Sequence, residues 1–327
     1  MYESFDVKDK KILFELDRNA RQTDSEIAKK VGVSKQVANY RIHRLLKNNI
    51  INNFYSFINV GKLGLETYYV FFQLEGINKE EEQKLLEKLE KLSYVGWLVS
   101  SVGRWDVVLL LFADSISMFD KLLTNILNIC GNHLHEYTFT TMLTAEHISY
   151  KFLSDDDTFN SVKQTEKTTK INLGETEKKI LSAISNDARK SVVDISREKN
   201  IPIHKVTYSL KNMMRKEIIE GFKPKINVHK LNYQWHLLLI QFQPSHSKRK
   251  KEFISFCKQH DKVYYVTNTI GSYNIMLDVF VKSPEQFKEV LLELKDKFSN
   301  LIKLYESVVI FDEFKINYYP EELLRTI

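Results

Sequence analysis

Between Asp6 and Asn48, apolar residues recur every three or four positions, which is the spacing of one face of an α-helix. The pattern predicts three short helices: Asp6 caps the first, a capping box at residues 23–26 starts the second, and Ser34 caps the third. Gly32 stands between the last two helices, where a residue without a Cβ atom best adopts the left-handed conformation. Two short helices joined by such a turn form a helix-turn-helix, whose second helix enters the major groove of DNA.

The pattern changes after Asn48. Alternation of apolar and polar residues from Ile50 to Val60 predicts a small wing or connecting strand. Apolar runs of strand length and one-faced helices then follow in the order Thr67–Leu74, Glu80–Leu92, Tyr94–Val102, Asp106–Phe112, Ile116–Ile129 and Leu134–Thr144. This βαββαβ order predicts a ferredoxin-like domain, in which one antiparallel sheet carries two helices on one face. The other face is apolar and needs a partner.

The same pattern occurs twice. When the sequence is compared with itself at a shift of 168 residues, matches continue without a gap from Phe5 to about Lys151. For example, Lys10–Leu13 recurs as Lys178–Leu181. The chain is therefore an internal duplication, and the second copy is the nearest candidate to cover the apolar sheet face of the first.

The expected fold class is α+β, with a winged helix-turn-helix domain followed by a ferredoxin-like βαββαβ domain, the whole unit present twice. The predicted boundaries are 1–53 for the first helix-turn-helix domain, 54–153 for the first ferredoxin-like effector or assembly domain, 154–172 for a polar linker, 173–221 for the second helix-turn-helix domain, and 222–327 for the second ferredoxin-like domain.

The second helix-turn-helix uses different residues for the same purposes. Ser191 begins its short second helix, Asn200 stands at the position of Gly32, and Pro202 takes the position of Ser34. Different residues that serve one geometry indicate a maintained structure.

Charge on the two third helices is the main functional observation. The chain has 48 basic and 42 acidic residues and a net charge of +6, yet residues 35–49 and 203–216 contain no acid. Basic side chains there are expected to neutralise phosphates, and polar ones to face base edges. The candidate DNA-binding residues are Ser34, Lys35, Gln36, Asn39, Tyr40, Arg41, His43, Arg44, Lys47, His204, Lys205, Thr207, Tyr208, Lys211, Asn212 and Arg215.

Composition excludes several classes of protein. The longest apolar run, Val107–Ala113, is too short to span a bilayer, and the N-terminus lacks the pattern of a secretion signal. Cys130 and Cys257 are too few for a disulfide framework. No catalytic triad, phosphate-binding loop or zinc signature occurs. We therefore expect a cytoplasmic protein that is not an enzyme, contacts no membrane, and needs neither cofactor nor metal.

The order of domains resembles the leucine-responsive regulatory protein (Lrp/AsnC, or feast/famine) family of transcription regulators, here in a tandem duplicated form. The residues that carry the resemblance are Asp6, Asp9, Ile12-Leu13, Asn19-Ala20-Arg21, Ile27-Ala28, Val31-Gly32-Val33-Ser34, Arg41-Ile42, Leu45, Asn49-Ile50-Ile51 and Gly103-Arg104-Trp105-Asp106. Members of this family ordinarily hold one unit per chain, dimerise through the βαββαβ domain, and bind an amino acid or a similar effector near the glycine turn.

The resemblance implies an effector or interface role for the glycine turns of both copies. The residues concerned are Gly103, Arg104, Trp105, Asp106, Gly271, Tyr273 and Asn274. Asn274 replaces the carboxylate of Asp106, which counts against one effector chemistry shared by both copies. A purely structural β-turn stays an open alternative.

The tandem arrangement suggests that one chain replaces the usual homodimer, with further homo-oligomers left open. Its two recognition helices would then lie roughly 34 Å apart, one turn of double-stranded DNA, on half-sites that differ. Two alternatives remain. One is an enzyme like the two-unit sirohaem decarboxylases, although Tyr94–Val102 contains no His or Arg; the other is an interaction scaffold that does not bind DNA.

Overall fold

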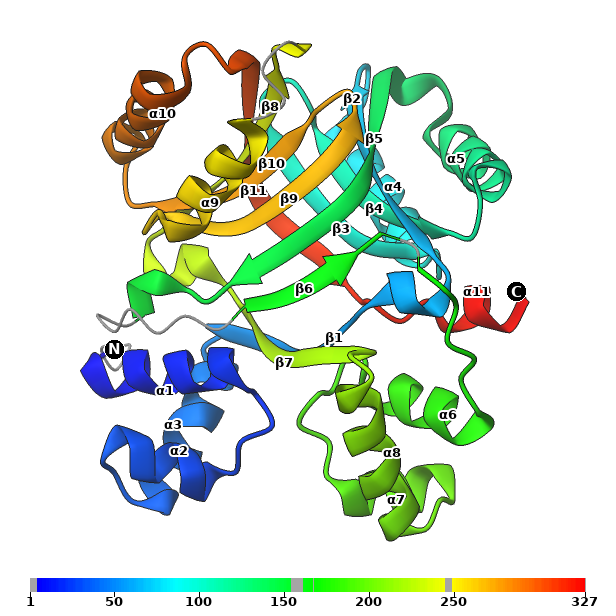
Figure 1. The fold of residues 1–327 in the computed structure, drawn as a ribbon, viewed down its shortest axis with the longest axis vertical. Helices are drawn as coiled ribbons and strands as arrows, with labels where there is room; N and C mark the ends of the chain where they lie inside the picture. The colour runs from blue at the N-terminus through cyan, green and yellow to red at the C-terminus, as the bar shows by residue number, and fades with distance from the viewer. Residues whose placement is uncertain (1–4, 154–160, 167, 245–248, 327) are drawn as a thin grey trace. The chain divides into compact units, whose positions relative to one another are not determined.

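The computed structural model describes residues 5–153, 161–166, 168–244 and 249–326. The chain divides into two compact units, which we name the helical unit (Met1–Ile58, His147–Val162 and Gly174–Tyr233) and the sheet unit (Asn59–Glu146, Lys163–Leu173 and Gln234–Ile327). Each unit combines segments of both copies: the helical unit holds both helix-turn-helix motifs, and the sheet unit holds both βαββαβ segments (Figure 1). The predicted α+β class and the duplicated order of elements are confirmed.

Each helix-turn-helix motif of the helical unit has three helices, and its helix ends follow local sequence signals. The helices are α1 (Val7–Arg18), α2 (Asp24–Val31) and α3 (Lys35–Lys47) in the first copy, and α6 (Glu175–Ile184), α7 (Val192–Lys199) and α8 (Ile203–Arg215) in the second. Thr23 forms the predicted capping box, and Gly32 ends α2 with a φ of 72°. In the second copy, Ser191 caps α7 and Asn200 ends it with a φ of 53°. The predicted exchange of Asn for Gly at the left-handed position is therefore confirmed.

The segments expected to form a wing or connecting strand pair with each other. Strand β1 (Ile51–Ile58) lies antiparallel to β7 (Ile219–Ile226), its equivalent in the second copy. Figure 1 shows this ribbon between the two groups of three helices. Each strand thus uses its counterpart to satisfy backbone groups that an isolated wing leaves to solvent.

Equivalent backbone hydrogen bonds join each helix-turn-helix to the other copy. The Ala20 N–H donates to the carbonyl of Phe222, and the Ala188 N–H donates to the carbonyl of Phe54, each at 2.9 Å. Ala20 and Ala188 occupy the same position in the two copies, so the two contacts are related by an approximate twofold symmetry.

Two arginines add equivalent side-chain contacts. Arg21 donates to the Ala188 carbonyl at 2.6 Å, and its guanidinium lies 5.3 Å from the centre of the Phe222 ring. Arg189 donates to the Ala20 carbonyl at 2.6 Å and lies 5.4 Å from the Phe54 ring. Stacked guanidinium groups of this kind combine a hydrogen bond with a cation–π attraction.

A buried ion pair forms a third link inside the helical unit. Lys223 on β7 places its Nζ 3.2 Å from Asp17 Oδ1 and 2.7 Å from the Asp17 carbonyl oxygen. The Tyr150 N–H donates to the other carboxylate oxygen of Asp17 at 3.1 Å. Both charged side chains are almost fully buried, so each depends on the other for compensation.

The sheet unit contains the predicted βαββαβ order twice. The first copy supplies β2 (Glu66–Leu74), α4 (Lys79–Glu90), β3 (Val95–Val102), β4 (Val107–Ala113), α5 (Ile116–Cys130) and β5 (Leu134–Ile148). The second supplies β8 (Gln234–Phe242), α9 (Lys250–Gln259), β9 (Val263–Gly271), β10 (Ile275–Val281), α10 (Pro284–Phe298) and β11 (Ile302–Ile316), followed by the short α11 (Glu321–Thr326).

The two sheets merge through their long last strands. The strand order is β2-β4-β3-β11-β8-β10-β9-β5-β6, and β5 also pairs with β2, so that eight strands close into a ring. Strand β11 pairs with β8 of its own copy over Ile302–Ile310 and with β3 of the other copy over Val309–Ile316. A strand of 15 residues is long enough to serve both partners, which explains how the two copies share one sheet.

The inner face of this sheet is aromatic. Trp97 of the first copy lies 6.1 Å from Trp235 of the second, measured between ring centres, and Phe71 lies 5.3 Å from Tyr273. The outer face of the first copy packs under α4 and α5 through residues such as Leu89 and Ile126. The apolar sheet face that the sequence left uncovered is therefore covered by the other copy.

The stretch expected to be a linker contains an additional strand. Residues 154–160 and 167 lie outside the described residues, but Ser161–Thr165 forms β6, which pairs with β5. The Thr168 N–H donates to the Gly61 carbonyl at 3.1 Å. A Cβ atom on Gly61 would lie only 2.4 Å from the Thr165 carbonyl oxygen, so glycine is required for this close approach. Among the described residues, none of the helices has the length and apolarity that a membrane span requires.

Replacement of Lys223 by Met tests the link between Asp17 and β7. The substitution leaves a buried carboxylate without its cation, and we expect the free energy of unfolding to fall by about 3–5 kcal/mol. The midpoint of urea unfolding measures this loss. Lys230→Met, at an exposed lysine of the turn that follows β7, is the control and should leave the midpoint nearly unchanged. Equal midpoints for the two variants would show that the pair does not stabilise the helical unit.

Candidate nucleic-acid interface

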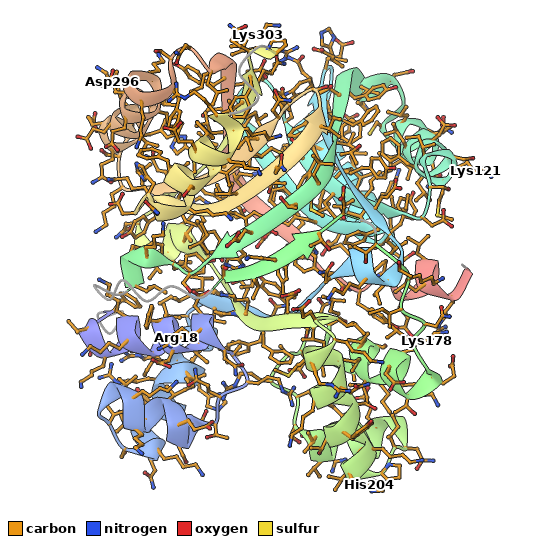
Figure 2. All side chains as sticks on the ribbon, in the orientation of Figure 1. Arg18, Lys121, Lys178, His204, Asp296 and Lys303 are labelled. Carbon is orange, nitrogen blue, oxygen red and sulfur yellow. The ribbon has the colours of Figure 1, made fainter. Side chains whose placement is uncertain are left out.

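The two third helices present their polar sides to solvent because their apolar residues are buried. Ala38, Ile42 and Leu45 hold α3 against the rest of its motif, and Val206, Leu210 and Met213 do the same for α8. The exposed candidate residues are Ser34, Lys35, Gln36, Asn39, Tyr40, His43, Lys47, His204, Lys205, Tyr208, Lys211 and Arg215. Thr207 and Asn212 are half-buried. Figure 2 labels His204 at the N-terminal end of α8.

Arg41 and Arg44 differ from the other candidates because they are tied to acids of α1 and its cap. Arg44 Nη2 lies 2.6 Å from Asp9 Oδ2, and Arg41 Nη1 lies 2.9 Å from Asp9 Oδ1. Arg41 also bonds the Asp6 carboxylate at 2.8 Å, and the hydrogen bond to Asp6 raises the pKa of Arg41. Asp9 is fully buried, so these two arginines compensate its charge. Two of the four basic residues on α3 therefore hold α1 against α3.

The second copy holds its first helix by a hydrogen bond from a serine hydroxyl instead of by ion pairs. Glu177 stands at the position of Asp9, and its Oε1 accepts a hydrogen bond from the Ser209 hydroxyl at 3.3 Å. Ser209 replaces Arg41 and is buried. Lys205, Lys211 and Arg215 consequently remain exposed on α8 without a carboxylate contact among the described residues.

Sequence reasoning missed the acids that face the first recognition helix. It counted charges along one helix, whereas Asp9 precedes Arg41 and Arg44 by 32 and 35 residues. A usable signal was present, because Asp6 and Asp9 belong to the same family pattern as Arg41.

The glycine turns use Asp106 and Asn274 in the same structural way. The Leu74 N–H donates to Asp106 Oδ2 at 2.7 Å, and the equivalent Phe242 N–H donates to Asn274 Oδ1 at 2.7 Å. An amide oxygen can accept this hydrogen bond, as a carboxylate oxygen does. The loss of charge at Asn274 is therefore compatible with one shared role.

The residues beside these two turns contact each other across the sheet unit. Trp105 Nε1 donates to the Tyr273 hydroxyl at 2.9 Å, and that hydroxyl donates to Glu306 Oε2 at 2.7 Å. Arg104 bonds the other oxygen of Glu306 at 2.7 Å and reaches Glu136 at 3.1 Å. Burial raises the pKa of Tyr273, which keeps it a neutral donor. The turn residues thus join the two copies.

The two glycines of these turns have positive backbone angles. Gly103 has a φ of 146° and Gly271 a φ of 125°, a region that disfavours residues with a Cβ atom. A Cβ atom on Gly103 would also lie 3.0 Å from the Ser307 carbonyl oxygen. Glycine at these positions lets the two turns approach the long strands closely.

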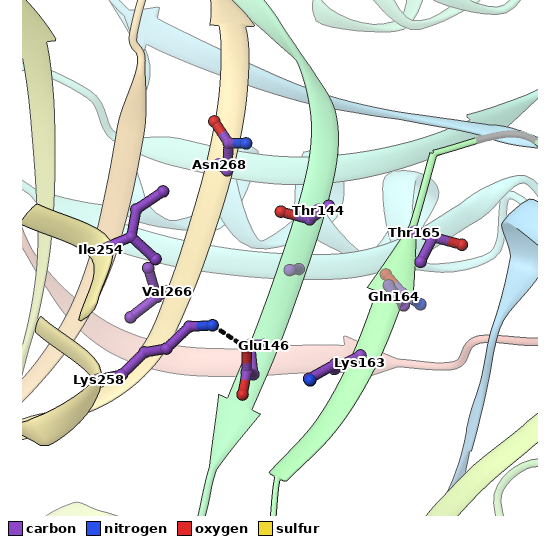
Figure 3. A pocket seen from close by; sticks show the side chains of 10 residues that line it. Thr144, Glu146, Lys163, Gln164, Thr165, Ile254, Lys258, Val266 and Asn268 are labelled. Carbon is purple, nitrogen blue, oxygen red and sulfur yellow. Dashed lines mark ion pairs between the residues drawn. The ribbon is translucent and has the colours of Figure 1, made fainter. Parts of the chain in front are cut away.

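A separate cavity of about 220 Å³ lies in the sheet unit between β5, β6, β9 and α9 (Figure 3). Lys258 forms an ion pair with Glu146 at its wall, and Lys163 lies on the other side of Glu146 in this view. Ile254 and Asn268 are also among the lining residues. Sequence analysis did not predict this cavity, because one of its walls is the unexpected strand β6.

Comparisons with known proteins match each copy separately. The winged helix-turn-helix DNA-binding family matches residues 5–52 and 173–220. An HTH-type transcriptional regulator of Pyrococcus furiosus is 33% identical over 110 residues, which cover 33% of this chain and 73% of that protein. HTH-type transcriptional regulator Ptr1 of Methanocaldococcus jannaschii is 32% identical over 115 residues, which cover 35% of this chain and 76% of Ptr1.

Solved structures match at two lengths. The siroheme decarboxylase NirDL covers 98% of this chain and 97% of its own chain, with a TM-score of 0.63 at 13% sequence identity. This likeness concerns the fold. Escherichia coli AsnC covers 43% of this chain and 93% of its own, with a TM-score of 0.35 at 22% identity.

The matched variants Asp9→Asn and Glu177→Gln test the different contacts that join the first and third helices in the two copies. Asp9→Asn leaves two arginines beside a neutral amide, so we expect a loss of about 3 kcal/mol in the free energy of unfolding. Glu177→Gln keeps an oxygen that can accept from Ser209, so its loss should stay at about 1 kcal/mol or less. Chemical unfolding of both variants provides the measurement. Equal losses of unfolding free energy in the two variants would contradict the conclusion that ion pairs join the first and third helices in the first copy alone.

Proposed function

The chain belongs to the Lrp/AsnC family of helix-turn-helix transcriptional regulators, and we propose that a single chain acts as a pseudo-dimer that binds two DNA half-sites. The observation that carries this proposal is the pairing of β1 with β7, because it joins the two helix-turn-helix motifs within one unit. A helix-turn-helix dimer binds half-sites about one helical turn apart, or a multiple of it. The equivalent contacts of Ala20 and Ala188 support a similar pseudo-symmetric arrangement here.

The half-sites of this regulator should differ in sequence. The exposed residues of α3 and α8 share Tyr40 and Tyr208 at equivalent positions, but their other polar residues differ. The differing pairs include Gln36 and His204, Asn39 and Thr207, and His43 and Lys211. Because base edges are read by the donors and acceptors of such side chains, two different helix surfaces favour a non-palindromic operator.

Exposed lysines at the same interface should contact the phosphate backbone. We expect Lys47→Ala and Lys211→Ala each to weaken binding of a selected duplex and to reduce the slope of log K against log salt by about 1. Fluorescence anisotropy at several salt concentrations measures both effects. Lys121→Ala, on the exposed face of α5 in the sheet unit (Figure 2), is the matched control. Unchanged slopes for Lys47→Ala and Lys211→Ala, or selection of a perfect palindrome, would contradict the proposed interface.

We further propose that the cavity beside β6 takes a small zwitterionic effector such as an amino acid. Glu146 offers a carboxylate for an ammonium group, Lys258 and Lys163 offer cations for a carboxylate, and Ile254 offers an apolar contact. The glycine turns, named above from family resemblance, are the alternative place for such an effector. Trp105 and Tyr273 of those turns are buried against each other, whereas the cavity offers about 220 Å³ of open volume beside its charged residues, which favours the cavity.

Thermal unfolding in the presence of single amino acids tests the effector site. We expect at least one amino acid to raise the Tm of the wild-type protein. Lys258→Met should abolish that rise, because the carboxylate of the bound amino acid loses the cation of Lys258. A response that survives in Lys258→Met but disappears in Tyr273→Phe would assign the effector to the turns.

Sirohaem, tested in the same way, should leave the Tm of the protein and its own absorption spectrum unchanged, since β3 contains no His or Arg and Arg104 is ion-paired. A spectral shift would favour the enzyme alternative.

A further inference from the structure

Three side chains form a continuous hydrogen-bonded series from the second copy to the first recognition helix. Arg189 Nη2 lies 2.7 Å from Asp24 Oδ1, and Asn39 Nδ2 lies 2.7 Å from Asp24 Oδ2. Arg189 belongs to the second copy, Asp24 opens α2, and Asn39 lies on the exposed side of α3. The Asp24 carboxylate therefore bridges the copies and has one oxygen for each partner.

This arrangement determines which way the Asn39 amide points. A carboxylate only accepts hydrogen bonds, so the NH₂ group of Asn39 must face Asp24. One N–H is used there, and within the described part of the chain the second N–H and the Oδ1 oxygen have no hydrogen-bond partner. These are the donor and the acceptor that an asparagine presents to the N7 and N6 atoms of adenine in the major groove.

Arg189 is itself held firmly by the first copy. Its Nη1 donates to the carbonyl oxygens of Ala20 at 2.6 Å and Gln22 at 3.1 Å, and its guanidinium lies over the Phe54 ring. The side chain is about one-fifth exposed. Because these contacts to backbone carbonyls and to the ring hold the guanidinium in place, its Nη2 group has a defined position from which to bond Asp24.

Among the described residues, the second copy has no equivalent series. Val192 stands at the position of Asp24, and Thr207, at the position of Asn39, donates its hydroxyl to the Ile203 carbonyl of its own helix at 3.0 Å. Arg21, the equivalent of Arg189, keeps the backbone and ring contacts. The two arginines therefore share a role in joining the copies, and only Arg189 also reaches a polar residue of a recognition helix through a carboxylate.

We propose that Asn39 reads an adenine in the first half-site and that Arg189 of the second copy is a positioning residue that orients Asn39 through Asp24. This inference rests on the proposed DNA-binding function and names a specificity determinant within it. Holding the amide before DNA arrives reduces the ordering that binding would otherwise require. It also makes the base preference of the first recognition helix depend on the presence of the second copy.

Selection of duplexes from a random pool, followed by affinity measurements on single-base variants, tests the proposal with the full chain. For the wild type, we expect one position of one half-site to prefer adenine by roughly tenfold to a hundredfold. Asn39→Ala should abolish this preference and leave the salt dependence of binding unchanged. Asp24→Ala and Arg189→Met should each weaken the preference severalfold at that position, with other positions unaffected.

Arg21→Met is the matched control, because it removes the equivalent contacts between the copies but no contact to Asp24, the α2 carboxylate that bonds Asn39. We expect it to keep the adenine preference. If Asn39→Ala retains the preference, Asn39 is not the reader. If Asp24→Ala and Arg189→Met retain it, or if Arg21→Met loses it equally, the positioning role is wrong. Failure of the wild type to select any duplex would instead contradict the proposed function itself.

Discussion

The fold of this chain depends on one constraint, which is that the edges of its β-strands need hydrogen-bonding partners. Backbone N–H and carbonyl groups at a strand edge must be paired, covered or left to water. Strand β1 finds its partner in β7, and the long strands β5 and β11 each continue from a sheet of their own copy to the sheet of the other. The helical unit and the sheet unit are thus each built from both copies, and the positions of both recognition helices within the helical unit follow from this pairing.

The two copies have diverged within this shared framework. Position 9 of the first copy and position 177 of the second both carry an acid that contacts the third helix, but Asp9 bonds two arginines whereas Glu177 bonds a serine. Both solutions hold the first helix in place. They differ in what they leave on the surface, because Arg41 and Arg44 are bonded to Asp9, whereas the basic residues of α8 are exposed. The turns at Asp106 and Asn274 diverged without such a consequence, since both side chains serve as acceptors.

Local signals allowed the sequence to predict the helices and the order of strands. The capping box at Thr23, the left-handed Gly32 and Asn200, and the apolar run of β2 extend over a few residues, so they can be recognised without knowing the fold. Strand β6 was missed because it is a polar edge strand, held by backbone hydrogen bonds and without the apolar side-chain pattern that predicts a strand. The ion pairs of Arg41 and Arg44, and the contact between Asn39 and Asp24, were missed because charge counted along one helix does not register groups brought in by neighbouring elements.

Covalent fusion changes how the β1–β7 ribbon depends on the amount of protein. In a homodimer, assembly of such a ribbon is bimolecular, and the fraction of active regulator falls as the protein is diluted. Here both strands belong to one polypeptide, so their effective concentration is set by the intervening chain. The fraction of chains with a paired ribbon should then stay constant on dilution, whereas the ribbon of a two-chain dimer would be lost.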